Sequence, residues 1–432
     1  MRVLFYILLI AGIGNVVLRP EMENPLTLYR ILAPVCLIVL FALRPMKVIR
    51  WLGLFAIFLV YNIVLATAYS LDYSQFFPSI VHYLYLFILL VLMVDMKSQN
   101  VDFDAQYLRF VEWFYVFLLL NLLVEFFVGT TIYPNLYIDE TDEASLRAFF
   151  WNQNDVAIVL CIVAWLALTL DRYKGMVRWT VVLITILVLY YNDSKAALLS
   201  LMLVSLPIYS IFRVCRTVSI TPKVWFAFFG TLFALVVVSI VSLSGVPINF
   251  LNDTYTLGDL LVDPITRIFS LQASDEQWGS LNNRTDAAIF VIIEYLKSFG
   301  FGLGAGGSWL VLTMPQYELG GAKSAHNALL QFIVDFGYPV LFGYLAMVFW
   351  ALSKLFKRSI REIDRLKVMA ILSFPLLGLS QSGAIVTNYF FFASVYFIWM
   401  LGHELGQTKQ SRETCEIGQI NSQSVLHDGG AR

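Results

Sequence analysis

The chain has 432 residues, of which 59% are hydrophobic and 14% charged, against about 45–50% and 25% in soluble domains. A water-facing surface cannot be built from this small number of charged residues. The composition therefore excludes a soluble globular protein and indicates a protein embedded in lipid. The 29 Lys and Arg residues nearly balance the 30 Asp and Glu residues, which excludes a cationic surface for nucleic acid.

Apolar runs that approach the ~20 residues of a transmembrane helix recur along the chain. The first follows Met1-Arg2 and has no cleavage site of small residues, so we expect an uncleaved span. We therefore predict an all-α fold, a polytopic transmembrane helical bundle of about twelve spans. The spans are predicted at 3–18, 27–43, 50–69, 76–94, 108–128, 154–170, 177–191, 195–212, 223–246, 338–354, 368–382 and 386–402.

Basic residues gather after the second, sixth, eighth and tenth spans. Examples are Arg44 and Lys47, Arg172 and Lys174, and the cluster from Lys354 to Lys367. Because cytoplasmic loops carry an excess of Lys and Arg, these ends are predicted to face the cytoplasm, together with both termini. The remaining loops are then extracytoplasmic.

Two of the predicted outer loops are long. Residues 129–153 contain the acidic run Asp139–Glu143, and residues 247–325 form a loop rich in Asp, Asn and Gly. Loops of this length are usually functional, so the second is the first place to look for chemistry. The predicted organisation is spans one to nine in 1–246, the large loop with short helices in 247–325, spans ten to twelve in 326–405, and a disordered cytoplasmic tail in 406–432.

The middles of nearly all predicted spans have no ionisable residue, and His82 is the main exception. Ion-coupled transporters place charged groups within their spans, because the translocated charge needs a partner there. This pattern weakens a transport function, although it leaves open a carrier for a neutral solute.

Within the large loop, Asn282-Asn283-Arg284 precedes a mostly apolar stretch from Ala287 to Leu296. We predict a helix, capped by Asn, that lies in the membrane interface or packs on the bundle. Arg284 would then lie near backbone N–H groups suited to an anion. The alternative is an interfacial arginine that touches lipid headgroups.

Five glycines follow within the eight residues 300–307. Glycines permit positive φ and close backbone approach, so the N–H groups of Gly302 and Gly304 could cradle a phosphate. No Gly-Lys-Ser/Thr follows, so this is not a nucleotide-binding P-loop. A flexible turn is the plainer interpretation.

The loop ends with Lys323-Ser324-Ala325-His326-Asn327 before a second apolar stretch. Ser324 is the expected N-cap, which would place His326 in the first helical turn. A helix N-terminus lowers the pKa of an imidazole, so His326 could accept a proton near neutral pH as a general base. A histidine that only caps or donates a hydrogen bond is the alternative.

A further cation, Lys195, stands in the short turn Asn192-Asp193-Ser194-Lys195 before the eighth predicted span. By itself, a lysine here could simply extend to the membrane interface.

Together these motifs resemble the O-antigen polymerase and O-antigen ligase superfamily of bacterial envelope glycosyltransferases. The resemblance covers roughly residues 150–340, in the order expected for the family. It rests on Phe150 to Asn154, Asp193 to Leu199, Asn283-Arg284 through Gly304, and His326 to Gln331.

The resemblance implies transfer of a glycan from undecaprenyl pyrophosphate to an acceptor hydroxyl on the outer face, without a metal, cofactor or nucleotide. It assigns catalysis to His326 and Arg284, and pyrophosphate binding to Lys195, Arg284, Gly302 and Gly304. The family's Ser-Arg turn is Ser194-Lys195 here, and lysine lacks the bidentate fork of arginine.

We expect a polymerase of polysaccharide repeat units in the bacterial inner membrane. Its partners would be the lipid-linked glycan, an acceptor glycan, membrane lipid and a chain-length regulator protein, with no nucleic acid. Ser194-Lys195 resembles the turn of exopolysaccharide polymerases, and the acidic run Asp139–Glu143 is ill-suited to anionic lipid A. The alternatives are a ligase that transfers glycan to lipid A–core, and, from another class, a lipid-linked oligosaccharide flippase or a small-solute transporter.

Overall fold

We analysed a computed structural model of the chain. The structure describes residues 2–13, 28–68, 73–100, 102–129, 146–148, 150, 153–192, 194–217, 247–250, 253–256, 266, 270, 280–314, 327–357, 359–379 and 398. Of these, residues 12–13, 73–75, 217, 247–250, 253–256 and 280–284 are described by their backbone alone.

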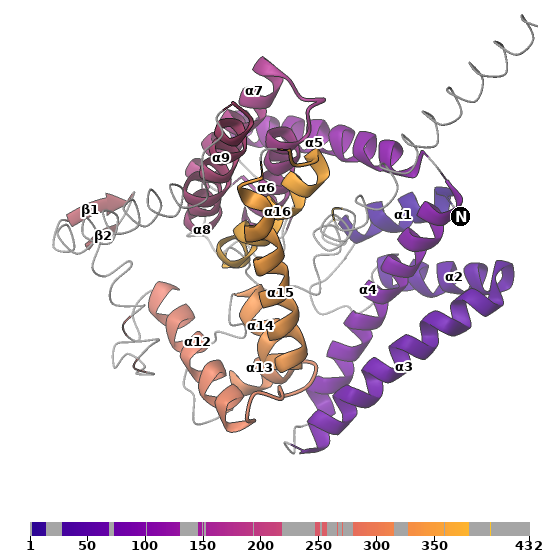
Figure 1. The fold of residues 1–432 in the computed structure, drawn as a ribbon. Coiled ribbons are helices and arrows are strands. Elements are labelled where there is room, and N and C mark those ends of the chain that lie inside the picture. The colour runs from indigo at the N-terminus through magenta and orange to yellow at the C-terminus, as the bar shows by residue number, and fades with distance from the viewer. Residues whose placement is uncertain are drawn as a thin grey trace, which may run out of the picture.

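Helices dominate the described chain, and Figure 1 shows how they are arranged. Those that precede the large loop are α1 (Arg2–Ile13), α2 (Leu28–Leu43), α3 (Pro45–Ala68), α4 (Tyr73–Gln99), α5 (Phe103–Val128), α6 (Gln153–Thr169), α7 (Gly175–Tyr191), α8 (Lys195–Leu199), the π-helical segment η1 (Ser200–Ser205) and α9 (Leu206–Thr217). Those that follow its first part are α12 (Ser280–Lys297), α13 (Gly307–Val311), α14 (Ala328–Phe336), α15 (Tyr338–Leu355) and α16 (Glu362–Gly378).

The predicted spans coincide with helices wherever the structure describes them. The ninth span, and all but one residue of the twelfth, lie outside the described residues. Among the described helices, 5 are long and apolar enough to cross a bilayer, and α1, α2, α6 and α7 are shorter apolar helices. The chain is therefore a multi-pass helical membrane protein, and the predicted number of spans is not confirmed.

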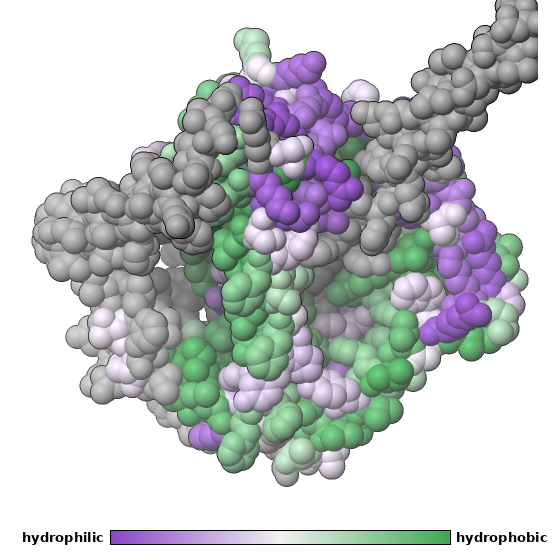
Figure 2. Space-filling view, in the orientation of Figure 1, coloured by the Kyte–Doolittle hydropathy of each residue, from purple (hydrophilic) through white to green (hydrophobic). Residues whose placement is uncertain are grey.

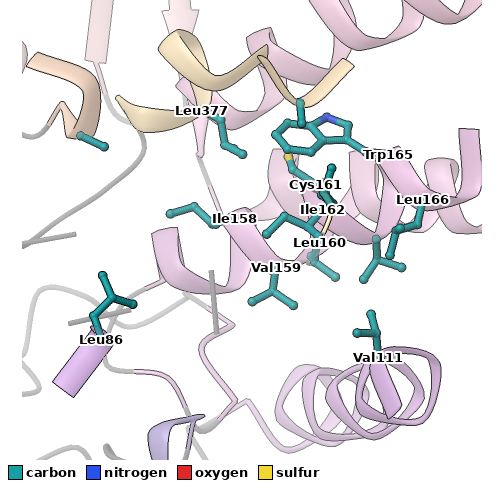
Figure 3. Close-up of a cluster of buried hydrophobic side chains, with 14 of the residues drawn as sticks. Leu86, Val111, Ile158, Val159, Leu160, Cys161, Ile162, Trp165, Leu166 and Leu377 are labelled. Carbon is teal, nitrogen blue, oxygen red and sulfur yellow. The ribbon is translucent and has the colours of Figure 1, made fainter. Parts of the chain in front are cut away.

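Helix α6 lies at the centre of the bundle. Every side chain from Val156 to Thr169 is buried, as is typical of a helix that is apolar on all sides and lies in a protein core or a membrane. α7, α16, α5 and α8 pack around it. Figure 3 shows Cys161 and Trp165 within this core, with Leu377 of α16 beside them.

A small polar network joins three helices inside the apolar core. The Ser205 hydroxyl lies 3.0 Å from that of Ser373 and accepts a hydrogen bond of 2.9 Å from Trp165 Nε1. Ser200 Oγ donates to the carbonyl oxygen of Ser373 at 3.1 Å. Hydrogen bonds between small polar side chains are a common means of fixing helices in membranes. Here they fix η1 against α6 and α16.

Ion pairs gather several helix ends at one end of the bundle, which we call the basic end. Arg44 and Lys47 both contact Asp95, and Asp171 pairs with Arg216 and Arg365. The Asp95 pairs join the end of α4 to the α2–α3 junction, and the Asp171 pairs join the ends of α6 and α9 to the start of α16. Each group thus brings together helix ends that were predicted to share one side of the membrane. Figure 2 shows hydrophilic residues gathered around the start of α16 and over the α2–α3 junction, with hydrophobic residues over α15.

The large loop contains more than the predicted short helices. Strands β1 (Pro247–Phe250) and β2 (Asp253–Thr256) form an antiparallel hairpin in which Pro247 pairs with Thr256 and Phe250 with Asp253. The prediction named only short helices for this loop, and the hairpin adds to them. The two strands are each only four residues long, and so short an alternation is hard to detect in sequence.

Candidate functional site

Lys195 begins helix α8, at the end of the bundle opposite the basic end. The eighth span continues from here to Arg216, which lies at the basic end through its pair with Asp171. The preceding turn is ordered by the Ser194 N–H, which donates to the Leu189 carbonyl at 2.9 Å. Ser194 Oγ lies 3.5 Å from Asn154 Oδ1 near the start of α6. Two of the sequence motifs, Phe150–Asn154 and Asp193–Leu199, therefore meet at this end.

Two buried side chains hold the segment 146–148 beside the turn of Lys195. Asn192 accepts from the Leu146 N–H at 2.9 Å and donates to the Leu146 carbonyl at 2.8 Å. Glu125 Oε2 accepts from the N–H groups of Arg147 and Ala148 at 2.9 and 2.7 Å. Residues 146–148, near the end of the predicted loop 129–153, are thus fixed beside the turn that precedes Lys195. Neither Glu125 nor Asn192 was singled out from the sequence.

The last turn of α16 relates Lys195 to the motif that contains His326. α8 and α16 run antiparallel and pack together, and Ser200 donates to the Ser373 carbonyl. Lys195 stands five residues before Ser200 and Gly378 five residues after Ser373, about 7.5 Å along each helix. Both therefore lie at the same level. A Cβ added at Gly378 would lie 3.4 Å from Cβ of Ala328, which is two residues after His326.

Helix α14 begins later than predicted. Its N-cap is Asn327, whose side chain accepts from the Leu330 N–H at 3.0 Å. The expected N-cap was Ser324, so His326 precedes the helix and does not belong to its first turn. His326 itself lies outside the described residues. Asn327 has the extended backbone and the side-chain hydrogen bond of an N-cap. Since Asn and Ser are about equally favoured at this position, the sequence alone could not choose between Asn327 and Ser324.

Arg284 is the fifth residue of α12, which begins at Ser280. The predicted asparagine cap was wrong by two residues or more, because both Asn282 and Asn283 lie inside the helix. Ala287, Ile289 and Val291 are fully buried, and α12 packs on α13 and α14. The sequence predicted a helix that lies in the membrane interface or packs on the bundle, and the structure shows that it packs on the bundle. The side chain of Arg284 lies outside the described residues.

The glycine-rich loop uses its N–H groups within the protein. Gly302 donates to Ser298 Oγ at 3.3 Å, and Gly304 to the Asp335 carbonyl at 2.8 Å. Ala305 donates to Asn62 Oδ1 at 2.8 Å. The predicted phosphate cradle does not match this arrangement, since these donors are already paired and buried. Sequence alone reveals that a loop is rich in glycine, but not which acceptors its amides meet.

Close packing explains why glycines are needed here. Gly302 has φ of +94°, and an added Cβ would lie 2.7 Å from the Gly337 nitrogen and 2.8 Å from the Asp335 carbonyl oxygen. Gly304 has φ of +90° and lies against Asn62 and Ala66 of α3. Left-handed backbone and close approach both exclude larger residues. The loop is a tightly packed turn between α12 and α13, not a flexible one.

Asp335 lies at the centre of this packing and was missed by the sequence reading. Its side chain is fully buried and accepts from the N–H groups of Ser308 at 2.8 Å and Gly306 at 3.3 Å. A usable signal existed, because Asp335 is the only charged residue between His326 and Lys354. An ionisable residue alone in an apolar stretch needs partners inside the fold.

Comparisons with known proteins agree with the class of protein that this fold defines. The chain is a polytopic helical membrane protein whose candidate site lies at the end opposite the basic end. The sequence model described as O-antigen ligase matches residues 180–345, a segment that begins in α7 and ends in α15.

A curated relative, the teichuronic acid biosynthesis protein TuaE of Bacillus subtilis, is 31% identical over 105 residues. The match covers 22% of this chain and 21% of the relative. These two matches, which cover only part of the chain, confirm the resemblance to the O-antigen ligase and polymerase superfamily.

Proposed function

We propose that the protein is a polysaccharide repeat-unit polymerase of the inner membrane, with the candidate site on the extracytoplasmic face and both termini in the cytoplasm. It transfers glycan from undecaprenyl pyrophosphate to a sugar hydroxyl of the acceptor. The observation that supports the proposal is the packing of the helices that carry or follow the three motifs. α8, which begins with Lys195, and the start of α14, just after His326, meet the last turn of α16, and α12 with Arg284 packs on α14.

The reaction needs a base and a positive environment for the leaving group. The acceptor oxygen forms a bond to the sugar C1, while the bond between C1 and the pyrophosphate oxygen breaks and its electron pair goes to the pyrophosphate. In the proposal, His326 takes the proton of the acceptor hydroxyl. Arg284 and Lys195 stabilise the negative charge that develops on the pyrophosphate. Gly302 and Gly304 shape the site, since their N–H groups are paired within the protein.

Replacement of the charged residues tests these roles. His326→Ala should reduce transfer by about 10²–10⁴-fold, the usual contribution of a general base. Arg284→Lys should be strongly impaired, because the planar guanidinium is lost. Lys195→Ala should be impaired and Lys195→Arg active, since arginine restores the fork of the family's Ser-Arg turn.

A matched control is Lys174→Ala, which removes an exposed lysine at the basic end. Its transfer should equal that of the wild type. Transfer at the wild-type rate by His326→Ala or Arg284→Lys, at equal protein level, would refute the assigned role of that residue.

One specific observation favours a second function, ligation of finished glycan to lipid A–core. The matching family is described as O-antigen ligase, whereas the name of the curated relative refers to biosynthesis of teichuronic acid. Polymerase and ligase cleave the same bond between sugar and pyrophosphate, so they share the donor site. They differ in the acceptor, which is either a lipid-linked repeat unit or a sugar of the lipid A–core.

Deletion of the gene separates the alternatives. For a polymerase we expect single repeat units on the carrier, or single units on the core where a ligase is also present, and no long chains. Long polymer that accumulates on undecaprenyl pyrophosphate while the core stays bare would identify a ligase. Repeat units that stay on the cytoplasmic face would identify a flippase and overturn the proposal.

A further inference from the structure

We propose that Asp335 is a positioning residue, which fixes α14 against the glycine-rich loop and so determines where the His326-Asn327 motif stands. The link to catalysis rests on the proposed function, whereas the effect on the position of α14 does not. We call the contacts among Asp335, residues 301–308 and α3 the Asp335 latch.

The first set of contacts joins the end of α14 to the glycine-rich loop. The Asp335 carboxylate accepts from Ser308 and Gly306. The Asp335 carbonyl accepts from Gly304 N–H at 2.8 Å, and the Val334 carbonyl accepts from Leu303 N–H at 2.8 Å. With two side-chain and two main-chain acceptors on consecutive residues of one helix, α14 cannot rotate or slide without breaking several hydrogen bonds.

The second set of contacts joins both segments to α3. Asn62 accepts from the Ala305 N–H at 2.8 Å. The Tyr61 hydroxyl lies 3.1 Å from the Phe301 carbonyl oxygen and 2.9 Å from that of Phe336. Because α3 is one of the long apolar helices, the latch ties a short helix of nine residues to a rigid element of the bundle.

The other end of α14 shows what the latch positions. Ala328 contacts Gly378 in the last turn of α16, and Asn327 caps the helix. Residues 328–336 span about 13 Å at 1.5 Å per residue, so a change at Asp335 reaches the His326-Asn327 motif through one rigid helix. Displacement of a catalytic group by about 1 Å can reduce the rate about 10²-fold.

A disulfide reporter can measure the position of α14 without any assay of activity. A Cβ at Gly378 would lie 3.4 Å from Ala328 Cβ, close to the Cβ separation of about 3.5–4.5 Å in disulfides. Ala328→Cys with Gly378→Cys, in a chain whose four native cysteines are replaced by serine, should therefore crosslink readily under a mild oxidant. The rate of crosslinking then reports the approach of α14 to α16.

Asp335→Asn keeps the shape of the side chain but replaces one acceptor by an amide donor that faces an N–H group. We expect crosslinking about tenfold slower, because the loss of a buried acceptor favours displaced states. Thr313→Ala is the matched control, since the exposed Thr313 hydroxyl donates to the nearby Leu310 carbonyl and lies outside the latch, and it should crosslink at the parent rate. Crosslinking of Asp335→Asn at the parent rate would overturn the proposal.

Two milder variants keep the test decisive if Asp335→Asn fails to fold. Tyr61→Phe removes the hydroxyl that contacts Phe301 and Phe336, and Asn62→Ala removes the acceptor of Ala305 N–H. Each should slow crosslinking by a smaller factor of about threefold. Parent rates in both variants would show that the latch does not position α14.

Transfer is measured in chains with native cysteines, with lipid-linked repeat units extracted from the deletion strain as donor. Asp335→Asn should lower kcat about 10²-fold with little change in KM for the donor, since Arg284 and Lys195 lie on other helices. Slow crosslinking with transfer at the parent rate would overturn the link from Asp335 to the reaction. If His326→Ala also transfers normally, the proposed function fails as well, whereas the crosslinking result for the latch stands.

Discussion

Asp335 is an ionisable side chain held entirely out of water, and burial raises its pKa from 3.8 to about 6. The hydrogen bonds from Ser308 and Gly306 lower the pKa and offset part of this effect. The carboxyl binds its proton more tightly in the folded protein than in the unfolded chain. Its ionisation therefore costs stability at neutral pH, and that cost should disappear as the pH falls from about 6 to about 4.

We expect the free energy of unfolding to depend on pH because of the ionisation of Asp335. Asp335→Asn cannot titrate, so the stability of the wild type relative to this variant should rise on acidification below about pH 6, by at most about 1.4 kcal/mol per pH unit. The measurement is thermal unfolding in detergent at several pH values between about 4 and 7. A difference that stays constant, or falls on acidification, would contradict the buried carboxyl described here.

Gly302→Ala tests the packing of the glycine-rich loop. An added Cβ would overlap the backbone of Asp335 and Gly337 at a positive φ, so we expect a loss of about 2–4 kcal/mol in folding free energy. Gly343→Ala in α15 is the matched control, because nothing lies within 4 Å of a Cβ added there. Equal melting temperatures for the two variants in detergent would contradict the close approach at Gly302.

The eighth span changes its helical form where it meets the core. α8 passes into the π-helical segment η1 and then α9, and Ser200 and Ser205 on this segment both reach Ser373 of α16. Such π segments often occur at functional sites. Because η1 follows directly after α8, the contacts of Ser200 and Ser205 with α16 also fix the orientation of α8, which begins with Lys195.

Ser205→Ala should destabilise the bundle by about 1–2 kcal/mol, since Trp165 Nε1 and the Ser373 hydroxyl lose a buried partner. Ser210→Ala is a close control in the same span, because the exposed Ser210 bonds only to the Leu206 carbonyl of its own helix. Thermal unfolding of both variants measures the difference. If Ser205→Ala and Ser210→Ala have the same melting temperature, the network does not fix η1 as described.

Elements defined by long apolar runs could be predicted from the sequence, because twenty apolar residues have few alternatives to a transmembrane helix. Elements defined by partners distant in sequence could not. The Ala305 amide of the glycine-rich loop pairs with Asn62, 243 residues away, and the Gly304 amide with the carbonyl of Asp335. The start of α14 was misplaced for another reason, because Ser324 and Asn327 are both good N-cap residues and only the structure shows which one caps the helix. The predicted cytoplasmic side of the basic clusters rests on charge alone. Arg284, His326 and the glycines were singled out from their place in the sequence pattern, whereas Lys195 gained its role only from the resemblance to a family.

At the scale of the whole molecule, the two ends of the bundle should lie on opposite sides of the membrane. Cysteines at Lys195, Arg284 and His326 should react with an impermeant thiol reagent in intact spheroplasts. A cysteine at Arg172, which pairs with Glu112 at the basic end, should react only after the membrane is opened. Any one of the three site positions that needs disruption of the membrane would break the proposed site.

The latch also bears on how genes of this kind can recombine. The segment that matches the ligase family begins at residue 180, yet Tyr61 and Asn62, which secure its glycine-rich loop and α14, come from α3. A chimera that exchanges only the matching segment would inherit a loop whose anchoring residues were left behind in the other parent. Exchanges should therefore yield active hybrids chiefly when α3 travels with the segment, or when both parents carry the same tyrosine and asparagine.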